Sequence, residues 1–132
     1  GTRVPFIVKW PAKIKPGKSA ALVNQVDLLA SFAKLLNVEL SAEDARDSRN
    51  ILDALTGKDP VGLPFMIEEA RGLALRRGDW KYIPGGKGGE LYNLGSDIAE
   101  KTNVAAQNPE IVKSMVEQLK KCVKDGRIRQ QK

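Results

Sequence analysis

The chain has 132 residues, of which 22 are basic and 16 acidic, and its formal net charge is +6 with no histidine. The apolar share of 42% and charged share of 29% are ordinary for a globular protein of one-domain size. No apolar run approaches the ~20 residues of a membrane span, no signal peptide is evident, and the absence of histidine removes the commonest general base and metal ligand.

The chain opens with an apolar run that favours a strand. Residues 6–8 (Phe-Ile-Val) show no alternation of apolar and polar types, which is typical of a strand buried on both faces. We expect residues 4–10 to lack suitable partners within one copy of the chain. The segment would then pair with another molecule, lie across the following helix, or be mobile. Docking as an edge strand on the chain's own sheet is the competing possibility.

A helix is expected over residues 26–36, where apolar residues recur at helical spacing. Asp27 near its start can cap it or favour the positive end of its dipole, and Asn37 can end it in the left-handed conformation. A second, short helix is expected over residues 50–55, followed by Gly57.

The middle of the chain predicts an antiparallel meander. Residues 73–75, 80–83 and 90–94 read as three strands, joined by a tight turn at Gly78 and by a loose glycine-rich loop. Residues 65–69 (FMIEE) read as a fourth strand beside the first of these. Such a meander needs an apolar cover.

The cover is expected from a helix over residues 109–125. Pro109 suits its first position, Asn108 its N-cap, and Gly126 its end. Its apolar residues form one stripe, made of Ile111, Val112, Met115, Val116, Leu119, Cys122 and Val123. Residues 127–132 are expected to fray. The sequence thus predicts an α+β fold, a four-stranded antiparallel sheet covered by the C-terminal helix.

Three segments resemble sulfatases of the arylsulfatase type, in the alkaline-phosphatase-like superfamily. They are residues 1–11 (GTRVPFIVKWP), residues 47–57 (DSRNILDALTG), and the pair LALRRGDWKYI and ELYNLGSDIAEKTNVA within residues 73–105. Their order is that of the last third of a sulfatase. The resemblance therefore implies a C-terminal region, with residues 1–57 from the edge of the large α/β domain and residues 58–132 as a sheet-and-helix subdomain.

The resemblance also implies a mechanism that this chain does not carry by itself. Members of that family use a formylglycine made from a C/S-x-P-x-R motif, a Ca²⁺ ion, and Lys and His residues, and they are commonly periplasmic or secreted. We expect formylglycine and Ca²⁺ in a missing N-terminal catalytic domain, which would be the partner of this chain. The motif is absent around Cys122, whose place on an apolar helix face favours a small packed side chain over a nucleophile. We expect this chain alone to be inactive.

The resemblance further implies that the C-terminal subdomain walls one side of the substrate cleft. Glu69 and Arg71 follow an apolar strand where it gives way to a loop, so they are the candidate residues of the cleft edge. A solvated strand end is the simpler interpretation of both. Family members often have a histidine near the position of Glu69, and this departure leaves the substrate contact open.

Other candidate sites have simpler explanations. The pair Asp97 and Glu100 is better interpreted as a turn stabiliser than as a metal site. Neighbouring Glu68 and Glu69 point to opposite faces of a strand and cannot serve one substrate together. The glycines of residues 85–89 lack the context of a phosphate-binding loop. The basic residues are scattered along the chain with modest clusters at residues 9–18 and 120–132. No aromatic ladder interleaves them, which argues against nucleic-acid binding.

We therefore expect the chain to be the C-terminal part of a sulfatase that hydrolyses an aryl or carbohydrate sulfate. Two alternatives stay open: a same-fold phosphodiesterase or phosphonate hydrolase, and a stand-alone basic module that binds polyanions.

Overall fold

The computed structural model describes residues 4–69 and 72–129, which divide into two compact units. One unit comprises residues 65–69 and 72–124 together with Val4. The other comprises residues 5–64 and the end of the chain from residue 125. The predicted division at residue 57 into parts of two domains stays a prediction.

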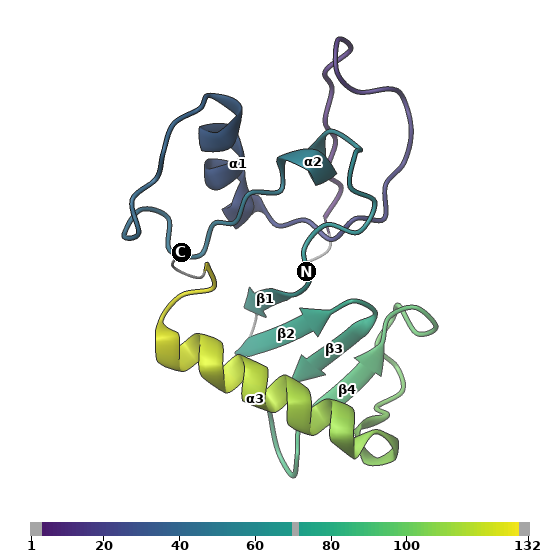
Figure 1. Ribbon diagram of the computed structural model, residues 1–132. Helices are drawn as coiled ribbons and strands as arrows, with labels where there is room; N and C mark the ends of the chain where they lie inside the picture. Colours follow the sequence, from purple (N-terminus) through teal and green to yellow (C-terminus); the bar gives the residue numbers. More distant parts are fainter. Residues whose placement is uncertain (1–3, 70–71, 130–132) are drawn as a thin grey trace. The chain divides into compact units, whose positions relative to one another are not determined.

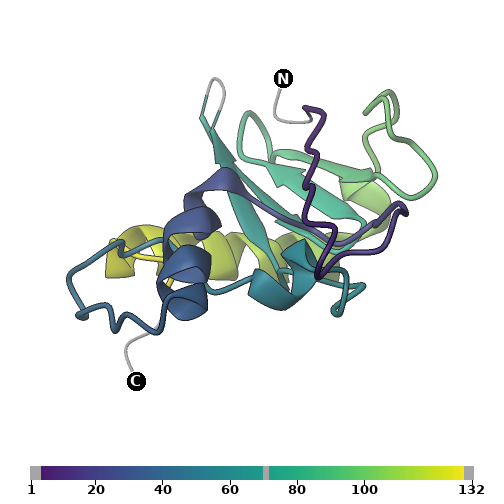
Figure 2. The same cartoon turned by 90° about the horizontal axis from the view of Figure 1, so that it is seen from above.

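The first unit is built on a four-stranded antiparallel meander in the order β1-β2-β3-β4. Its strands are β1 (Met66–Glu69), β2 (Leu73–Arg77), β3 (Trp80–Ile83) and β4 (Glu90–Asn93). Gly78 turns between β2 and β3 with φ of 56°. Helix α3 (Pro109–Asp125) lies across one face of the sheet (Figure 1), and Figure 2 shows the same layer from above. The predicted fold class is confirmed.

One row of side chains crosses all four strands and meets α3. Ile67 pairs with Leu75, Leu75 with Tyr82, and Tyr82 with Leu91. Because side chains alternate across a strand, this register puts all four on one face. The last three join Met115 and Leu119 of α3 in a buried core. The apolar stripe of α3 ends there, since Val123, which was expected to belong to it, is 58% exposed.

The free edge of β4 and its glycine-rich loop are both fixed by local contacts. Leu91 donates its N–H to the side chain of Asn103 and accepts from the N–H of Val104, so this segment covers the edge of β4. Gly89 has φ of 78°, and a Cβ there would lie 2.7 Å from the Tyr82 ring. Only glycine satisfies both the conformation and the close approach.

The second unit contains η1 (Gln25–Asp27), α1 (Leu28–Leu35) and α2 (Leu52–Leu55). Asn37 ends α1 with φ of 54°, and Gly57 follows α2 with φ of 75°, as expected from the sequence. A single parallel bridge joins Leu22 to Gly62, where a Cβ would lie 2.3 Å from the Leu22 carbonyl oxygen. The loop after α2 is thereby held against the segment before η1.

A buried polar network joins α1 to residues 48–51. Asp27, 1% exposed, accepts a hydrogen bond from the Arg49 N–H at 2.5 Å, and the Arg49 Nε lies 3.5 Å from the same oxygen. Ser48 Oγ accepts from the Ala30 N–H, and Ser31 Oγ accepts from the Ile51 N–H. Asp27 occupies the N-cap position of α1, where the sequence allowed a cap or an interaction with the helix dipole, and its side chain makes no cap hydrogen bond. Burial raises its pKa, against the hydrogen bond and charge of Arg49.

The predicted N-terminal strand does not form. Residues 4–10 have no regular secondary structure, and Phe6, Ile7 and Val8 are 43%, 88% and 42% exposed. The run has no strand partner among the described residues, since the sheet consists of β1 to β4 alone. Its N–H and C=O groups therefore take part in no ladder there. The expectation that one copy of this chain does not satisfy the segment is confirmed.

The residues after α3 do not fray as far as they are described. Arg127 donates to the Ala42 carbonyl at 3.1 Å, and Arg129 donates to the Ser41 carbonyl at 2.7 Å. The Ile128 N–H donates to Asp47 Oδ1 at 2.8 Å. These contacts hold the loop of residues 41–47. The expectation of a frayed tail is wrong for residues 127–129, because their donors meet carbonyls distant in sequence; residues 130–132 lie outside the described part.

We expect the cross-strand row to dominate the stability of the first unit. Leu91→Ala should lower the free energy of unfolding by about 2–5 kcal/mol, because Leu91 is fully buried against rigid neighbours. Val123→Ala is the matched control on the exposed side, with a change within about 0.5 kcal/mol. Urea unfolding followed by circular dichroism measures both. Equal losses in the two variants would contradict the assignment of the core.

Candidate functional site

Of the two residues predicted for a cleft edge, the structure describes Glu69. Glu69 is the last residue of β1, opposite Leu73, and is exposed. Arg71 lies outside the described residues. The burial of β1 alternates, with Glu68 buried and Glu69 exposed. This agrees with the argument that the two carboxylates point to opposite faces of the strand.

A second cross-strand row occupies the face of the sheet opposite α3. Met66 pairs with Arg76, Arg76 with Lys81, and Lys81 with Tyr92. On the same face, two residues after Met66 in β1, Glu68 lies opposite Ala74. Ala74 is the small residue that β2 places opposite Glu68 on this face.

Lys81 contacts two carboxylates on this face. Its Nζ donates to Glu100 Oε1 at 2.8 Å and lies 3.1 Å from Glu68 Oε2. The side chains of Lys81 and Glu68 are 12% and 7% exposed, and that of Glu100 is 31% exposed. We call these three residues the Lys81 cluster. It ties β1, β3 and the loop after β4 together across four strands.

The electrostatics of this face follow from its hydrogen bonds. Burial lowers the pKa of Lys81, but the bonds to Glu100 and Glu68 outweigh it, and the net shift is upward. The contribution of Lys81 to stability is therefore complete at neutral pH and is lost only as pH rises through the raised pKa. Beside it, Tyr92 donates to Glu90 at 2.6 Å, which raises the pKa of Tyr92 to about 12.

The Lys81 cluster is not predicted by the sequence, although part of its signal is present there. Alternation in β1 and β3 already places Glu68 and Lys81 on the faces away from the core. Their meeting depends on the register through Ala74, and the role of Glu100 depends on a loop conformation with φ of 54°. Neither is visible in local sequence. The cluster tethers the strand that leads into the candidate cleft edge.

The remaining candidates behave as structural groups. Asp97 accepts hydrogen bonds from the N–H groups of Lys101 and Thr102, both at 2.8 Å, and so stabilises a turn as expected. Within residues 4–69 and 72–129, no group of three or more His, Cys, Asp or Glu side chains is placed so that it could hold a metal ion. None of the described helices is long and apolar enough to cross a membrane.

A cavity of about 300 Å³ lies in the second unit, between the start of α2 and the loop before Pro64. Arg49 lines it, but its Nε lies beside the buried carboxylate of Asp27. Asp53 and Asp59 add negative charge at the rim, and the Asp59 side chain already accepts from the Val61 N–H. The charges of the walls are therefore mixed, and they single out no class of ligand.

Comparison with known proteins gives one consistent result. The chain is 39% identical over 137 residues to an N-acetylgalactosamine-6-O-sulfatase of Bacteroides thetaiotaomicron. It is 38% identical over 83 residues to an arylsulfatase of Hemicentrotus pulcherrimus. A solved structure from a study of glycosaminoglycan metabolism by Bacteroides thetaiotaomicron superposes with a TM-score of 0.83 at 38% identity. No family model matches the chain.

These matches cover most of this chain and little of the relatives. The first covers 90% of this chain and 27% of the relative, the second 61% and 15%, and the solved structure 89% and 28%. The chain thus spans about a quarter of the length of the first relative and of the solved structure. The partial match is consistent with a C-terminal region.

We expect the Lys81 cluster to be a tightly coupled unit. Lys81→Met should lower the free energy of unfolding by about 3–5 kcal/mol, because it removes the cation that the buried Glu68 carboxylate contacts. The double variant Lys81→Met with Glu68→Leu should recover part of that loss. Urea unfolding of wild type, both single variants and the double variant gives the coupling energy. Additive losses would contradict the coupling.

Proposed function

We propose that this chain, a homologue of sulfatases, is the C-terminal part of an enzyme that hydrolyses sulfate esters. The observation that carries the proposal is the 39% identity to a sulfatase over 90% of the chain, together with the fold match at a TM-score of 0.83. The substrate class is an aryl or carbohydrate sulfate. The names of the relatives favour neither the phosphodiesterase nor the stand-alone polyanion module.

In this proposal the reaction centre lies outside the chain. A formylglycine would supply the nucleophile and a Ca²⁺ ion would polarise the sulfate, both in a catalytic domain that precedes this one. The described residues include no group suited to hold the metal, and Cys122 has none of the surrounding sequence of a formylglycine precursor. We therefore assign no catalytic step to this chain.

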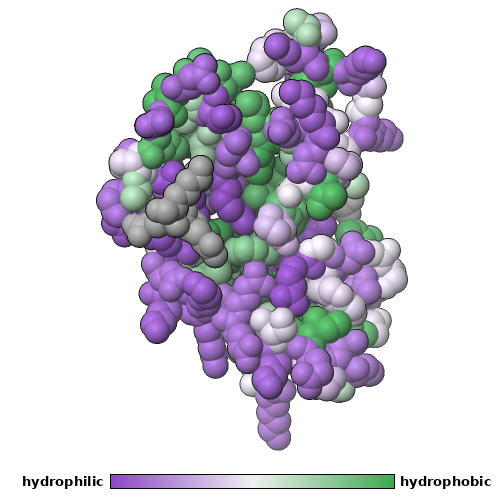
Figure 3. All heavy atoms as spheres, viewed as in Figure 1, coloured by the Kyte–Doolittle hydropathy of each residue, from purple (hydrophilic) through white to green (hydrophobic). Residues whose placement is uncertain are grey.

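The surface of the second unit supports a partner of this kind. Large apolar side chains of α1 and its flanks face solvent, among them Leu29, Phe32 and Leu36 at 55%, 50% and 71% exposure. Figure 3 shows hydrophobic residues gathered over α1, and the exposed residues 6–8 belong to the same unit. Exposed apolar area of this extent marks an interface. The missing catalytic domain is the occupant that the proposal requires.

The first unit would contribute a wall of the substrate cleft. Glu69 is exposed at the end of β1, one residue after the buried Glu68 of the Lys81 cluster. A rigid strand that ends in exposed polar groups is how scaffolds present binding residues. Glu69 and Arg71 are accordingly the proposed contacts for the part of the substrate away from the sulfate.

A chimera tests the proposed function. We expect that a Bacteroides N-acetylgalactosamine-6-O-sulfatase whose matching 27% is replaced by this chain still hydrolyses 4-nitrophenyl sulfate or N-acetylgalactosamine 6-sulfate. The same enzyme with that part deleted should be inactive, and so should this chain alone. A folded chimera without turnover, or turnover by the chain alone, would contradict the proposal.

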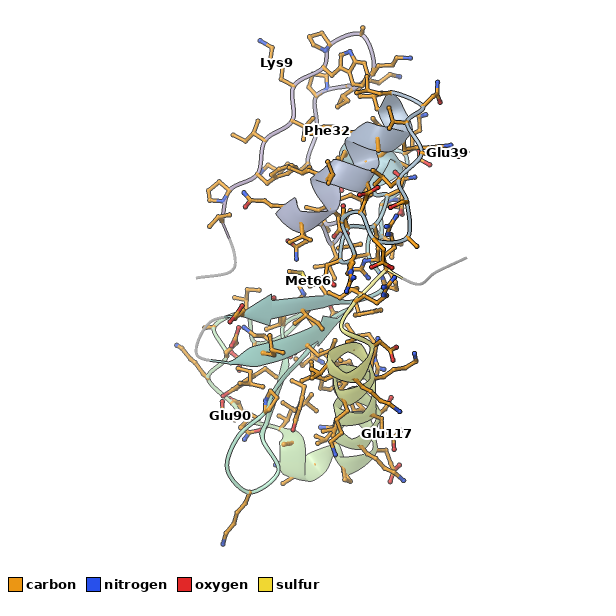
Figure 4. The ribbon with its side chains drawn as sticks, turned by 90° about the vertical axis from the view of Figure 1, so that its left-hand side faces the viewer. Lys9, Phe32, Glu39, Met66, Glu90 and Glu117 are labelled. Carbon is orange, nitrogen blue, oxygen red and sulfur yellow. The ribbon has the colours of Figure 1, made fainter. Side chains whose placement is uncertain are left out.

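The cleft edge is tested in the active chimera. Glu69→Ala and Arg71→Ala should each lower kcat/KM for a polymeric sulfated substrate by about 3–10-fold, roughly 1 kcal/mol, with little change for a small aryl sulfate. Their effect on stability should stay within about 0.5 kcal/mol. Glu117→Ala is the control, on the outer face of α3 (Figure 4). An unchanged ratio between large and small substrates in both variants would remove the assignment.

A further inference from the structure

The positive charge of this chain is concentrated at one end of its sequence. Residues 1–26 contain five basic residues and no acidic one, whereas the rest of the chain holds seventeen basic and sixteen acidic residues. Five of the six net charges therefore belong to the first fifth of the chain. Four of the five basic residues are lysines within residues 9–18, which we call the basic loop: Lys9, Lys13, Lys15 and Lys18.

The four lysines of the basic loop are exposed and carry uncompensated charge. No carboxylate of the described residues lies within ion-pair distance of any of them. Figure 4 shows the side chain of Lys9 extending away from the ribbon. Residues 9–18 themselves contain no acidic residue that could balance this charge. The basic loop is thus a local positive field rather than a balanced, solvated surface.

The loop is also partly pre-organised around an aromatic ring. The Trp10 carbonyl accepts hydrogen bonds from the N–H groups of Lys13 and Ile14, at 2.9 and 2.8 Å. This turn brings the Lys13 ammonium to 5.9 Å from the centre of the Trp10 ring. Pro11 within this turn and Pro16 after it restrict the backbone, which reduces the entropy lost when a ligand is bound.

We propose that the basic loop is a binding surface for sulfated polysaccharide. The inference rests on the proposed function, in which the parent enzyme acts on sulfate esters. A sulfated polysaccharide repeats negative groups along a flexible chain, so several lysines can each contact one sulfate, and the indole face of Trp10 can pack against a sugar ring. The basic loop contains Trp10 as its one aromatic residue, which is too few for the stacking ladder that single-stranded nucleic acid favours.

The test measures binding to this chain at two ionic strengths, with three polyanions as probes: chondroitin 6-sulfate, hyaluronan, which has carboxylates but no sulfate, and single-stranded DNA. Chondroitin 6-sulfate should bind most tightly. Changing all four lysines of the basic loop to Gln should weaken its binding by about tenfold or more and flatten its salt dependence. Circular dichroism verifies that the variant remains folded.

The matched control removes the same charge from the other unit. Lys87, Lys113, Lys120 and Lys124 are all exposed, and changing these four to Gln gives the same net charge as the loop variant. Retained binding in the control with loss in the loop variant supports the inference. Equal loss in both variants would show an effect of net charge alone and would overturn it, as would tighter binding of DNA, equal binding of hyaluronan, or no binding.

The outcome is separable from that of the proposed function. The binding measurement uses this chain alone, whereas the chimera measures turnover. An active chimera with a chain that does not bind chondroitin 6-sulfate would overturn only this inference. An inactive chimera with loop-dependent binding of the sulfated chain would overturn the proposed sulfatase function and leave the surface in place.

Discussion

The first unit depends on one row of side chains that runs across its sheet. Ile67, Leu75, Tyr82 and Leu91 occupy successive strands in register, and α3 places Met115 and Leu119 over the last three. A one-residue slip in any strand would turn its member of the row to the opposite face. The same register therefore determines where every polar side chain of the other face lies. The register of the apolar row thus fixes the strand positions of Glu68 and Lys81, whereas Glu100 of the same cluster is positioned by the loop after β4.

Each unit buries a charged side chain next to groups of opposite charge. Asp27 is surrounded by the N–H and guanidinium of Arg49, and Lys81 lies between Glu68 and Glu100. Buried ions of this kind add little net stability, but removing one partner is costly. They act by specifying which segments meet. In the second unit the Asp27 network attaches residues 48–51 to α1, and in the first the cluster attaches the loop after β4 to β1.

The two units differ in how completely they satisfy their own apolar residues. The first buries its core between sheet and helix, with Leu75, Leu91 and Met115 fully inaccessible. The second exposes much of α1 and the whole run of residues 6–8. A chain that matches about a quarter of its relatives' length is expected to show such a surface where the rest of the protein would pack. In our interpretation, the proposed catalytic domain would cover these exposed apolar side chains.

Sequence alone determined the elements whose signal is local. The period of α3, the glycine turn at Gly78, the end of α1 at Asn37 and the strands of the meander all follow from propensity and alternation. Tertiary structure decided the contacts between residues distant in sequence. It joined Lys81 to Glu100 and brought Arg127 and Arg129 to the loop of residues 41–47. It left the Phe6–Val8 run without a strand partner among the residues that the structure describes. These outcomes depend on register, loop conformation and available edges, which are properties of the assembled chain and not of any window of its sequence.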